Sequence, residues 1–177
     1  MTTVIAVKHA KGVTFSADTQ ATGEGGDIYR VVKVQENGPY IIAGAGDCAP
    51  LDIAQYIWKP PVPTATDAKD LLRFMIVKVI PSLKKVFKDN DYEYNTDPAA
   101  RQDGFTLIVA LYGEVFVIEK EFDVSMPQFN VAGIGSGAAY AIGAIRTGAT
   151  IKKAMEVAAE NDANSSAPFT ILEQLRK

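Results

Sequence analysis

The order of strand-like and helix-like segments predicts an α+β fold, a four-layer αββα sandwich in which two antiparallel sheets lie between layers of helices. Two observations carry this prediction. The first 46 residues alternate like β-strands separated by short turns. Two helical patterns, a second run of strands, two more helical patterns and one closing strand then follow. The chain has 177 residues, so we expect one domain spanning residues 1–177.

The N-terminal β structure is predicted from β-branched, alternating residues and from the turns between them. We expect strands over residues 2–9, 13–18, 29–35 and 39–46, turns over 10–12 and 36–38, and a glycine-rich loop over 23–26. Asp47 is placed to cap a helix that runs to about Trp58, and Pro50 is tolerated in its first turn.

A proline-rich connector over residues 59–66 leads to the second helix. This helix starts at Thr66 or Asp67, its apolar residues follow helical spacing, and Pro81 should kink it. We then expect a polar loop over 89–103, strands over 105–112, 115–119 and 131–134, helices over 137–147 and 150–161, and a closing strand over 169–175.

Composition excludes several classes of function. Hydrophobic residues make up 47% of the chain and charged residues 22%, which argues against disorder. The net charge is −3, so we expect no nucleic-acid partner. The apolar stretch from Val131 to Ile145 is too short and glycine-rich to span a bilayer, and no signal segment precedes the first strand. We therefore expect a cytoplasmic protein without membrane contact.

The chain has one cysteine, Cys48, and one histidine, His9. An internal disulfide, a cysteine-based zinc site and a multi-histidine metal site are therefore impossible. A Ser-His-Asp triad would depend on His9. We expect neither a metal nor a cofactor.

Three motif-like features are better explained as structure. The segment Gly133–Ala138 satisfies a dinucleotide fingerprint, but a second helix follows it instead of the required parallel strand. Acidic residues between Asp89 and Asp97 alternate as in an EF-hand, yet Tyr94 stands where glycine is needed and Ala100 where a glutamate belongs. The lysines of the helices are solvated faces.

Thr2 suggests a chemistry that needs no histidine. Removal of Met1 would bring the Thr2 hydroxyl within reach of its own α-amine, a base with a pKa near ~7.7. A threonine in a first strand is more often a simple β-former, so Thr2 alone does not decide the question.

Several blocks together resemble proteasome β-subunits and the HslV-type peptidases. They run in order through the chain and comprise Thr2-Thr3-Val-Ile-Ala-Val, Ser16-Ala-Asp-Thr-Gln-Ala-Thr22, Val32-Lys-Val34, Ile42-Ala-Gly-Ala-Gly46 and Gly133-Ile-Gly-Ser-Gly137. The resemblance implies the N-terminal-nucleophile hydrolase fold.

The resemblance also implies roles for individual residues. Thr2 matches the nucleophile, Asp18 and Lys33 match the acid–lysine pair of the site, and Gly46 matches the glycine whose N–H helps to bind the oxyanion. A cation beside the Thr2 amine would keep that amine neutral as a base. Ala45 resembles a position at the base of a substrate pocket.

Three further residues match a supporting hydrogen-bond network. Ser136 corresponds to the serine near the nucleophile, and Asp162 and Ser165 resemble the D-x-x-S element of proteasome β-subunits. Ser166 stands where a glycine often follows, and HslV itself departs from this element. Without the resemblance, Ser136 would be read as a helix N-cap.

These matches imply a threonine endopeptidase that cleaves peptides or unfolded proteins inside a homo-oligomeric ring, with an AAA+ unfoldase as a possible partner. Apolar residues on the outer helices, with Tyr56 and Trp58, offer material for subunit contacts. Two alternatives remain open. One is a non-catalytic ring or scaffold subunit that retains Met1, and the other is an amidohydrolase for a small molecule.

Overall fold

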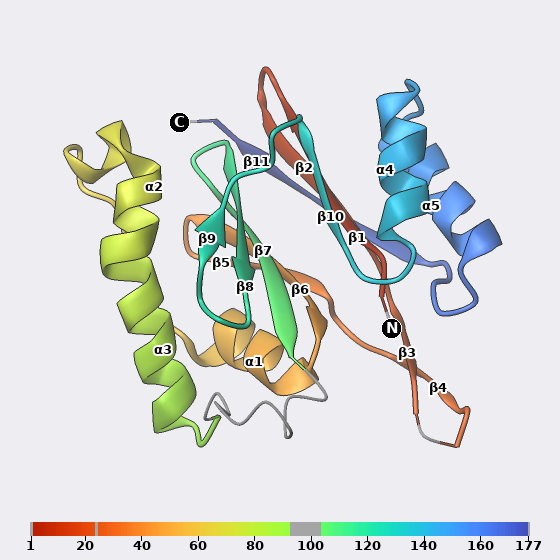
Figure 1. Ribbon diagram of the computed structural model, residues 1–177, viewed down its shortest axis with the longest axis horizontal. Helices are drawn as coiled ribbons and strands as arrows, with labels where there is room; N and C mark the ends of the chain where they lie inside the picture. The colour runs from red at the N-terminus through yellow and green to blue at the C-terminus, as the bar shows by residue number, and fades with distance from the viewer. Residues whose placement is uncertain (1, 24, 93–103, 177) are drawn as a thin grey trace.

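The first sheet is built from both ends of the chain (Figure 1). The structure is a computed structural model that describes residues 2–23, 25–92 and 104–176. Four antiparallel strands lie in the order β10 (Val131–Ile134), β1 (Val4–His9), β2 (Gly12–Asp18) and β11 (Phe169–Leu175). Val4 is paired with Ala17, so the start of the chain lies beside the end of β2. The closing strand has the bounds predicted from the sequence.

The second sheet has five antiparallel strands. Their order is β5 (Val34–Asn37), β6 (Tyr40–Gly46), β7 (Phe105–Leu111), β8 (Glu114–Glu119) and β9 (Val124–Ser125). Almost every residue of β6 and β7 is buried, because side chains cover both faces of this sheet. The second run of strands is confirmed to within one residue at each end. β9 was not predicted, since two residues show no periodicity.

The single strand predicted over residues 29–35 is wrong. The chain forms a two-stranded ribbon of β3 (Gln20–Thr22) and β4 (Ile28–Arg30), leaves strand conformation over 31–33 and resumes at β5. At this break Lys33 turns inward, and its Nζ contacts the carboxylate of Asp18. Local alternation could not reveal a break that a tertiary contact produces.

The helix after β6 starts where it was predicted. α1 (Cys48–Asp52) continues as a π-helical turn, η1 (Ile53–Ile57). Asp47 occupies the N-cap position, but its carboxylate makes no hydrogen bond to the helix. Its Oδ2 accepts a hydrogen bond from the Tyr92 hydroxyl at 3.1 Å instead.

The second helix starts later than predicted. A single 3₁₀ turn, η2 (Asp67–Lys69), precedes α2 (Leu71–Phe74), and the Asp70 carboxylate caps α2 by accepting a hydrogen bond from the Arg73 N–H at 3.0 Å. A π-helical turn, η3 (Met75–Val79), then leads into α3 (Ile80–Asp89). Pro81, where a kink is predicted, lies in the first turn of α3, directly after this wide turn.

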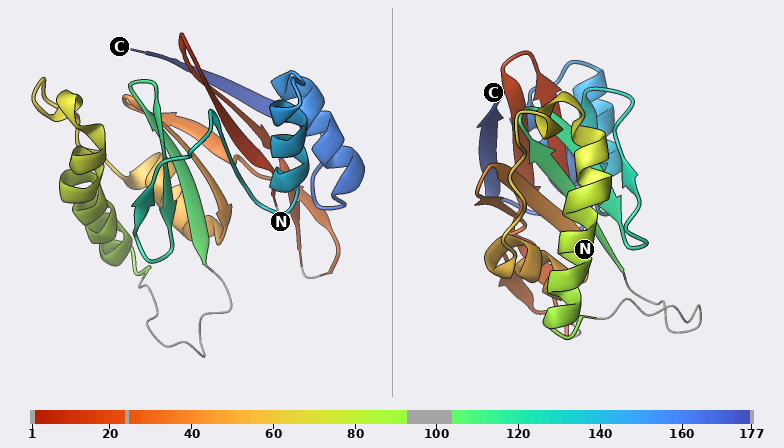
Figure 2. Two further views of the ribbon diagram at one scale, coloured as in Figure 1. Left: turned by 45° about the horizontal axis from the view of Figure 1, so that its top comes forward. Right: turned by 90° about the vertical axis from the view of Figure 1, so that its left-hand side faces the viewer.

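The last two helices are confirmed to within one residue of their predicted bounds. They are α4 (Ala138–Arg146) and α5 (Ile151–Asn161), and both lie beside the four-stranded sheet (Figures 1 and 2). Thr150 caps α5 by accepting a hydrogen bond from the Lys153 N–H at 3.3 Å. Within the described residues, no helix is long and apolar enough to cross a membrane.

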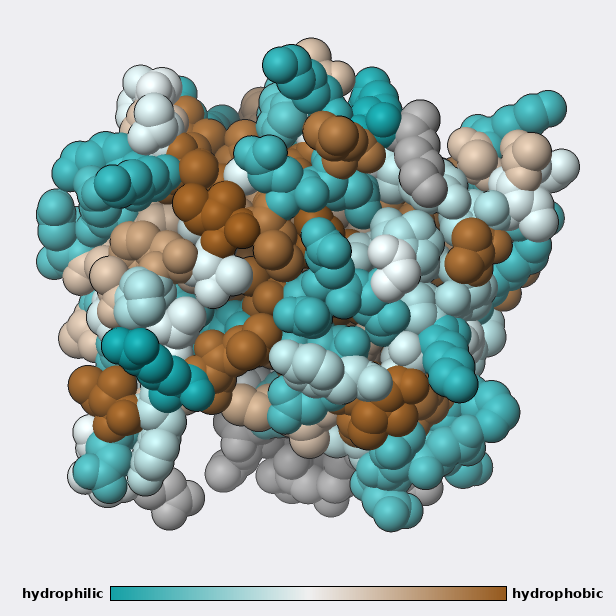
Figure 3. Space-filling view, turned by 180° about the vertical axis from the view of Figure 1, so that it is seen from behind, coloured by the Kyte–Doolittle hydropathy of each residue, from teal (hydrophilic) through white to brown (hydrophobic). Residues whose placement is uncertain are grey.

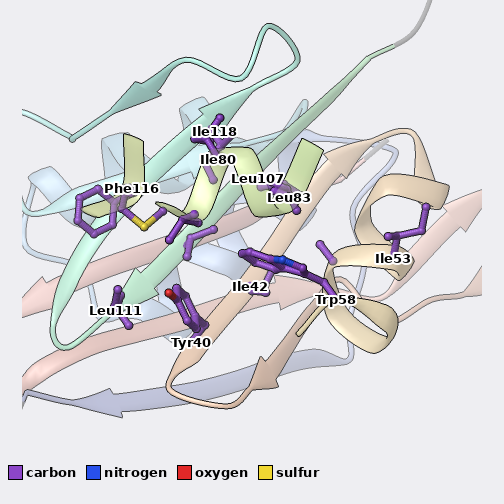
Figure 4. Packing of buried hydrophobic residues seen from close by; sticks show 14 of the residues in the cluster. Tyr40, Ile42, Ile53, Trp58, Ile80, Leu83, Leu107, Leu111, Phe116 and Ile118 are labelled. Atoms are coloured by element: carbon purple, nitrogen blue, oxygen red, sulfur yellow. The ribbon is translucent and has the colours of Figure 1, made fainter. Parts of the chain in front are cut away.

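Buried apolar side chains form three clusters. One fills the space between the two sheets and includes Phe15 and Ile108. A second lies between the other face of the five-stranded sheet and α1–α3, where Tyr40 and Trp58 pack with ring centroids 5.9 Å apart (Figure 4). A third joins α4 and α5 to Ile5 of the four-stranded sheet.

The predicted combination of antiparallel sheets and helices is therefore confirmed. The suggestion that Trp58 offers a subunit contact is wrong, because this side chain is only 4% exposed and its Nε1–H donates a hydrogen bond to Ser82. The EF-hand-like residues Glu93, Asn95 and Asp97 lie outside the described residues.

Candidate active site

A buried ion pair lies at the end of β2. Asp18 is fully buried and Lys33 is 4% exposed, and Lys33 Nζ lies 2.9 Å from each carboxylate oxygen of Asp18. The same ammonium donates a hydrogen bond to the Gln20 carbonyl. Asp18 also accepts hydrogen bonds from the N–H groups of Thr3, at 2.7 Å, and Gln20, at 3.0 Å. Oxygen ligands and backbone donors thus compensate both charges in the interior.

Burial sets the electrostatics of this pair. It lowers the pKa of Lys33, and the hydrogen bond and charge of Asp18 oppose that effect only in part. The Lys33 ammonium therefore gives up its proton more readily than that of an exposed lysine. The Asp18 carboxylate that it contacts also accepts a hydrogen bond from the N–H of Thr3.

A second polar cluster surrounds Asp162, directly after α5. Its Oδ2 accepts hydrogen bonds from Ser165 Oγ at 2.6 Å and from Ser136 Oγ at 2.8 Å. Its Oδ1 accepts one from the Asn164 N–H at 3.2 Å. Burial raises the pKa of Asp162, but the hydrogen bonds from Ser165, Ser136 and Asn164 outweigh it and hold the pKa below its usual value. Asp162 is thus an anion at neutral pH.

Thr2 and Thr3 lie between these two clusters. They are 7% and 0% exposed, and the Thr3 hydroxyl lies 2.6 Å from Ser165 Oγ. The loop after β10 lies close to both residues, at Gly135 and Gly137. Gly135 has a φ of +91°, and a Cβ there would lie 1.9 Å from the Thr2 carbonyl oxygen. A Cβ at Gly137 would lie 2.0 Å from Thr3 Oγ1. These two positions therefore admit only glycine without a rearrangement.

A pocket of about 90 Å³ opens beside the chain start. Thr2 and Lys33 line it together with Ala45 and Gly46 at the end of β6, and the exposed thiol of Cys48 lies at the same pocket. Gly46 has a φ of +95°, and a Cβ there would lie 1.9 Å from the Gly104 carbonyl oxygen. β6 can end at this point only with a residue that lacks a side chain.

The seven residues singled out in the sequence thus fall into two groups. Thr2, Lys33 and Gly46 line the pocket, and Asp18 pairs with Lys33. Ser136 and the two residues of the D-x-x-S element, Asp162 and Ser165, meet around the carboxylate of Asp162. Sequence reasoning missed Thr3, which bonds to both groups. The available signals were the threonine doublet at the start and the glycines of the Gly133–Gly137 block.

One group of carboxylates has the proximity that a metal ion needs. Within the described residues, Glu119, Glu121 and Asp123 bring their oxygens within 4.8 Å of one another. All three are exposed: Glu119 ends β8, and Glu121 and Asp123 lie in the turn that leads to β9. None lines the pocket at Thr2. Exposed acidic groups of this kind are common on protein surfaces.

Comparisons with known proteins agree with this architecture. No protein-family model matches the chain, and no curated protein sequence matches it significantly. The structure of eukaryotic HslV from Trypanosoma brucei covers 98% of this chain and 99% of its own at 22% identity, with a TM-score of 0.65. BPH from Thiobacillus denitrificans covers 99% and 98% at 18% identity, with a TM-score of 0.73, and has also been solved in complex with epoxomicin.

A third structure extends the comparison. Anbu, an ancestral β-subunit, from Yersinia bercovieri covers 98% of this chain and 81% of its own at 12% identity, with a TM-score of 0.67. At these identities the likeness establishes the fold. The chain has the same fold as HslV, BPH and Anbu.

Proposed function

We propose that this chain is a threonine endopeptidase whose nucleophile is the hydroxyl of Thr2. One observation carries the proposal: Thr2 shares a pocket with the buried Lys33 and with Gly46. The proposed fold is the four-layer αββα sandwich of the N-terminal-nucleophile hydrolases, in one domain over residues 1–177. The core clusters support it, because each lies between two neighbouring layers.

The proposed reaction starts with removal of Met1, which frees the Thr2 amine. This amine takes the proton of the Thr2 hydroxyl while Oγ1 attacks the carbonyl carbon of a peptide bond. The Gly46 N–H stabilises the negative charge that develops on the carbonyl oxygen. The amine then gives the proton to the departing amino group, which leaves an ester on Thr2. Water hydrolyses this ester and regenerates the free hydroxyl.

Lys33 has an electrostatic role in this scheme. A positive charge close to the Thr2 amine disfavours the protonated amine, so the amine stays available as a base near neutral pH. The same charge favours the ionised hydroxyl. Asp18 holds the ammonium in place through two contacts of 2.9 Å. The hydrogen-bonded group of Ser136, Asp162 and Ser165 supports the backbone of Thr2 and Thr3 through the hydroxyl of Thr3.

The proposed substrate is an extended segment of a peptide or unfolded protein. β6 ends at the pocket, and Ala45 leaves space in it for an apolar side chain before the cleaved bond. A polypeptide in extended conformation can align its backbone with such a strand end. No step of the scheme uses a metal or a cofactor.

We also propose that copies of the chain form a homo-oligomeric ring in the cytoplasm, to which an AAA+ unfoldase delivers substrates. Large apolar side chains of η1 and η3 remain exposed. The exposed fractions are 59% for Tyr56, 51% for Ile57, 51% for Ile76 and 54% for Val77. Seen from behind the view of Figure 1, the surface also carries separate apolar patches among hydrophilic residues (Figure 3). Light scattering tests the ring, and a stable monomer of 19.0 kDa would contradict it.

Intact-mass measurement and inhibitor labelling test the catalytic proposal. We expect a mass that lacks Met1, and we expect epoxomicin to add its mass to the N-terminal peptide. Thr2→Ala, the matched control, should acquire no adduct. Retained Met1 would favour the scaffold alternative. A free Thr2 that hydrolyses small amides but no peptides would favour the small-molecule amidohydrolase.

A further inference from the structure

Every polar group of Thr3 has a partner. This residue is completely buried. Its N–H donates to Asp18 Oδ1 at 2.7 Å, and its carbonyl oxygen accepts a hydrogen bond from the Asp18 N–H at 3.0 Å. Its hydroxyl lies 2.6 Å from Ser165 Oγ. Thr3 therefore connects the carboxylate that faces Lys33 to the cluster around Asp162.

The hydrogen bonds of this cluster have a fixed direction. An ionised carboxylate can only accept, so the single hydroxyl proton of Ser165 goes to Asp162 Oδ2 at 2.6 Å. Thr3 must then donate its own proton to Ser165 Oγ. The chain of donors runs from Thr3 through Ser165 to Asp162, and hydrogen bonds that end on a charge are stronger than neutral ones.

The backbone at Gly137 approaches the Thr3 hydroxyl closely. A Cβ at Gly137 would lie 2.0 Å from Thr3 Oγ1, 3.0 Å from Asp162 Oδ2 and 3.2 Å from Ser165 Oγ. Gly137 therefore lies directly against all three oxygens, where a side chain has no room. The hydrogen bond to Ser165 Oγ, and not contact with a side chain of the loop, orients the Thr3 hydroxyl.

We propose that Thr3 is a positioning residue for the reaction at Thr2. Its hydroxyl, anchored through Ser165 to Asp162, holds the backbone of Thr3 and so orients the preceding residue in the pocket that Thr2 shares with Lys33. The inference rests on the proposed function, since it assigns to Thr3 an effect on the Thr2 nucleophile. The effect is on the reacting geometry, and binding in the pocket is left unchanged.

Two substitutions at this position separate orientation from packing. Thr3→Val keeps the shape of the side chain and removes the hydroxyl, whereas Thr3→Ser keeps the hydroxyl and removes a methyl group. Thr14→Val on β2 is the matched control, because it makes the same chemical change at a partly exposed site that bonds to His9. Epoxomicin labelling of Thr2, followed by intact mass, gives kinact and KI for each variant.

We expect Thr3→Val to lower kinact by about tenfold or more, the size of effect that a small misplacement of a reacting group produces. KI should stay within about twofold, because the pocket lining is intact. Thr3→Ser should recover most of kinact, and Thr14→Val should match the wild type. Ser165→Ala removes the acceptor of the Thr3 hydroxyl, so it should lower kinact to the same extent and add little to Thr3→Val.

The outcomes distinguish this inference from the proposed function. If the wild type, with Thr2 at its N-terminus, acquires no adduct, the proposed function and the positioning role of Thr3 are both refuted. If the wild type is labelled and Thr3→Val has the same kinact, the positioning role alone is overturned. An equal loss in Thr3→Ser also overturns it, because packing would then explain the effect. If Thr3→Val does not fold, a wild-type kinact in Ser165→Ala overturns the inference in its place.

Discussion

Gly135 is the position at which the candidate site is most sensitive to an added side chain. Its φ is +91°, a conformation that glycine adopts readily and other residues rarely adopt. A Cβ there would lie 1.9 Å from the Thr2 carbonyl oxygen and 2.5 Å from the Thr2 carbonyl carbon. Both contacts are with backbone atoms, which cannot rotate away as a flexible side chain can. We therefore predict that Gly135→Ala moves Thr2 as well as destabilising the fold.

The magnitude follows from two contributions. The left-handed conformation costs a residue with a side chain about 1–2 kcal/mol. Forcing an extra methyl group into a well-packed place costs about 1–3 kcal/mol. We expect Gly135→Ala to lower the free energy of unfolding by about 2–5 kcal/mol, the sum of these two ranges.

Gly143→Ala is the matched control. Gly143 lies inside α4, and no atom lies within 4 Å of a Cβ added there. Alanine in a helix interior is more stable than glycine by about 0.5–1 kcal/mol, so this variant should unfold at a higher urea concentration than the wild type.

Urea unfolding of both variants gives the two free energies, and epoxomicin labelling under native conditions reports on Thr2. We expect Gly135→Ala to lose labelling even where it is folded, and Gly143→Ala to be labelled like the wild type. A Gly135→Ala protein with wild-type stability and a wild-type labelling rate would show that the loop after β10 does not hold the chain start.

Four further predictions concern the charges and the pocket. Lys33→Met should lower the free energy of unfolding by about 3–5 kcal/mol in urea titrations, because it leaves the buried Asp18 carboxylate without its cation. Adding Asp18→Asn to this variant should recover part of the loss, because it removes the unpaired charge. Burial lowers the pKa of Lys33 in the folded protein, so below pH 10.5 the unfolded chain binds more protons than the folded one. The difference in free energy of unfolding between the wild type and Lys33→Met should therefore widen as the pH rises toward 10.5. Burial raises the pKa of Asp162 but its hydrogen bonds lower it more, so its stabilisation should be present at neutral pH and be lost as the pH falls below 3.8; acid unfolding of Asp162→Asn should lack this step. Ala45→Val should fill part of the pocket and slow the cleavage of peptides with a large residue before the cut by about tenfold, measured with a pair of fluorogenic peptides that differ only there.

Much of the fold was accessible from the sequence because its strands are regular. β1, β2 and β11 show alternation or β-branched runs, and the turn between β1 and β2 carries Gly12, so local rules place them. The break over residues 31–33 was not accessible, because it arises where Lys33 turns toward Asp18. Propensity describes a segment in isolation, and a buried ion pair overrides it.

The candidate site was predictable to a different extent. The resemblance selected Asp18, Lys33 and the residues around Asp162, and the structure brings each group together. Thr3 could not be selected in this way. Its hydroxyl bonds to Ser165, which lies 162 positions away in the sequence, and neither the threonine doublet nor the glycines of the Gly133–Gly137 block indicate that partner. The pairing of β2 with both β1 and β11 brings these segments together.

The Gly133–Gly137 block shows how one pattern serves two kinds of chemistry. A dinucleotide fingerprint has glycines so that the backbone can approach a pyrophosphate closely. In this chain the same spacing lets the backbone approach its own chain start, with Gly135 against Thr2 and Gly137 against Thr3. The two uses differ in the group that lies opposite the glycines. In this chain, the strand that pairs with β10 determines which residues lie there. Because β10 pairs with β1, the space that glycine leaves open is filled by Thr2, the proposed nucleophile, and by Thr3, the residue proposed to orient it.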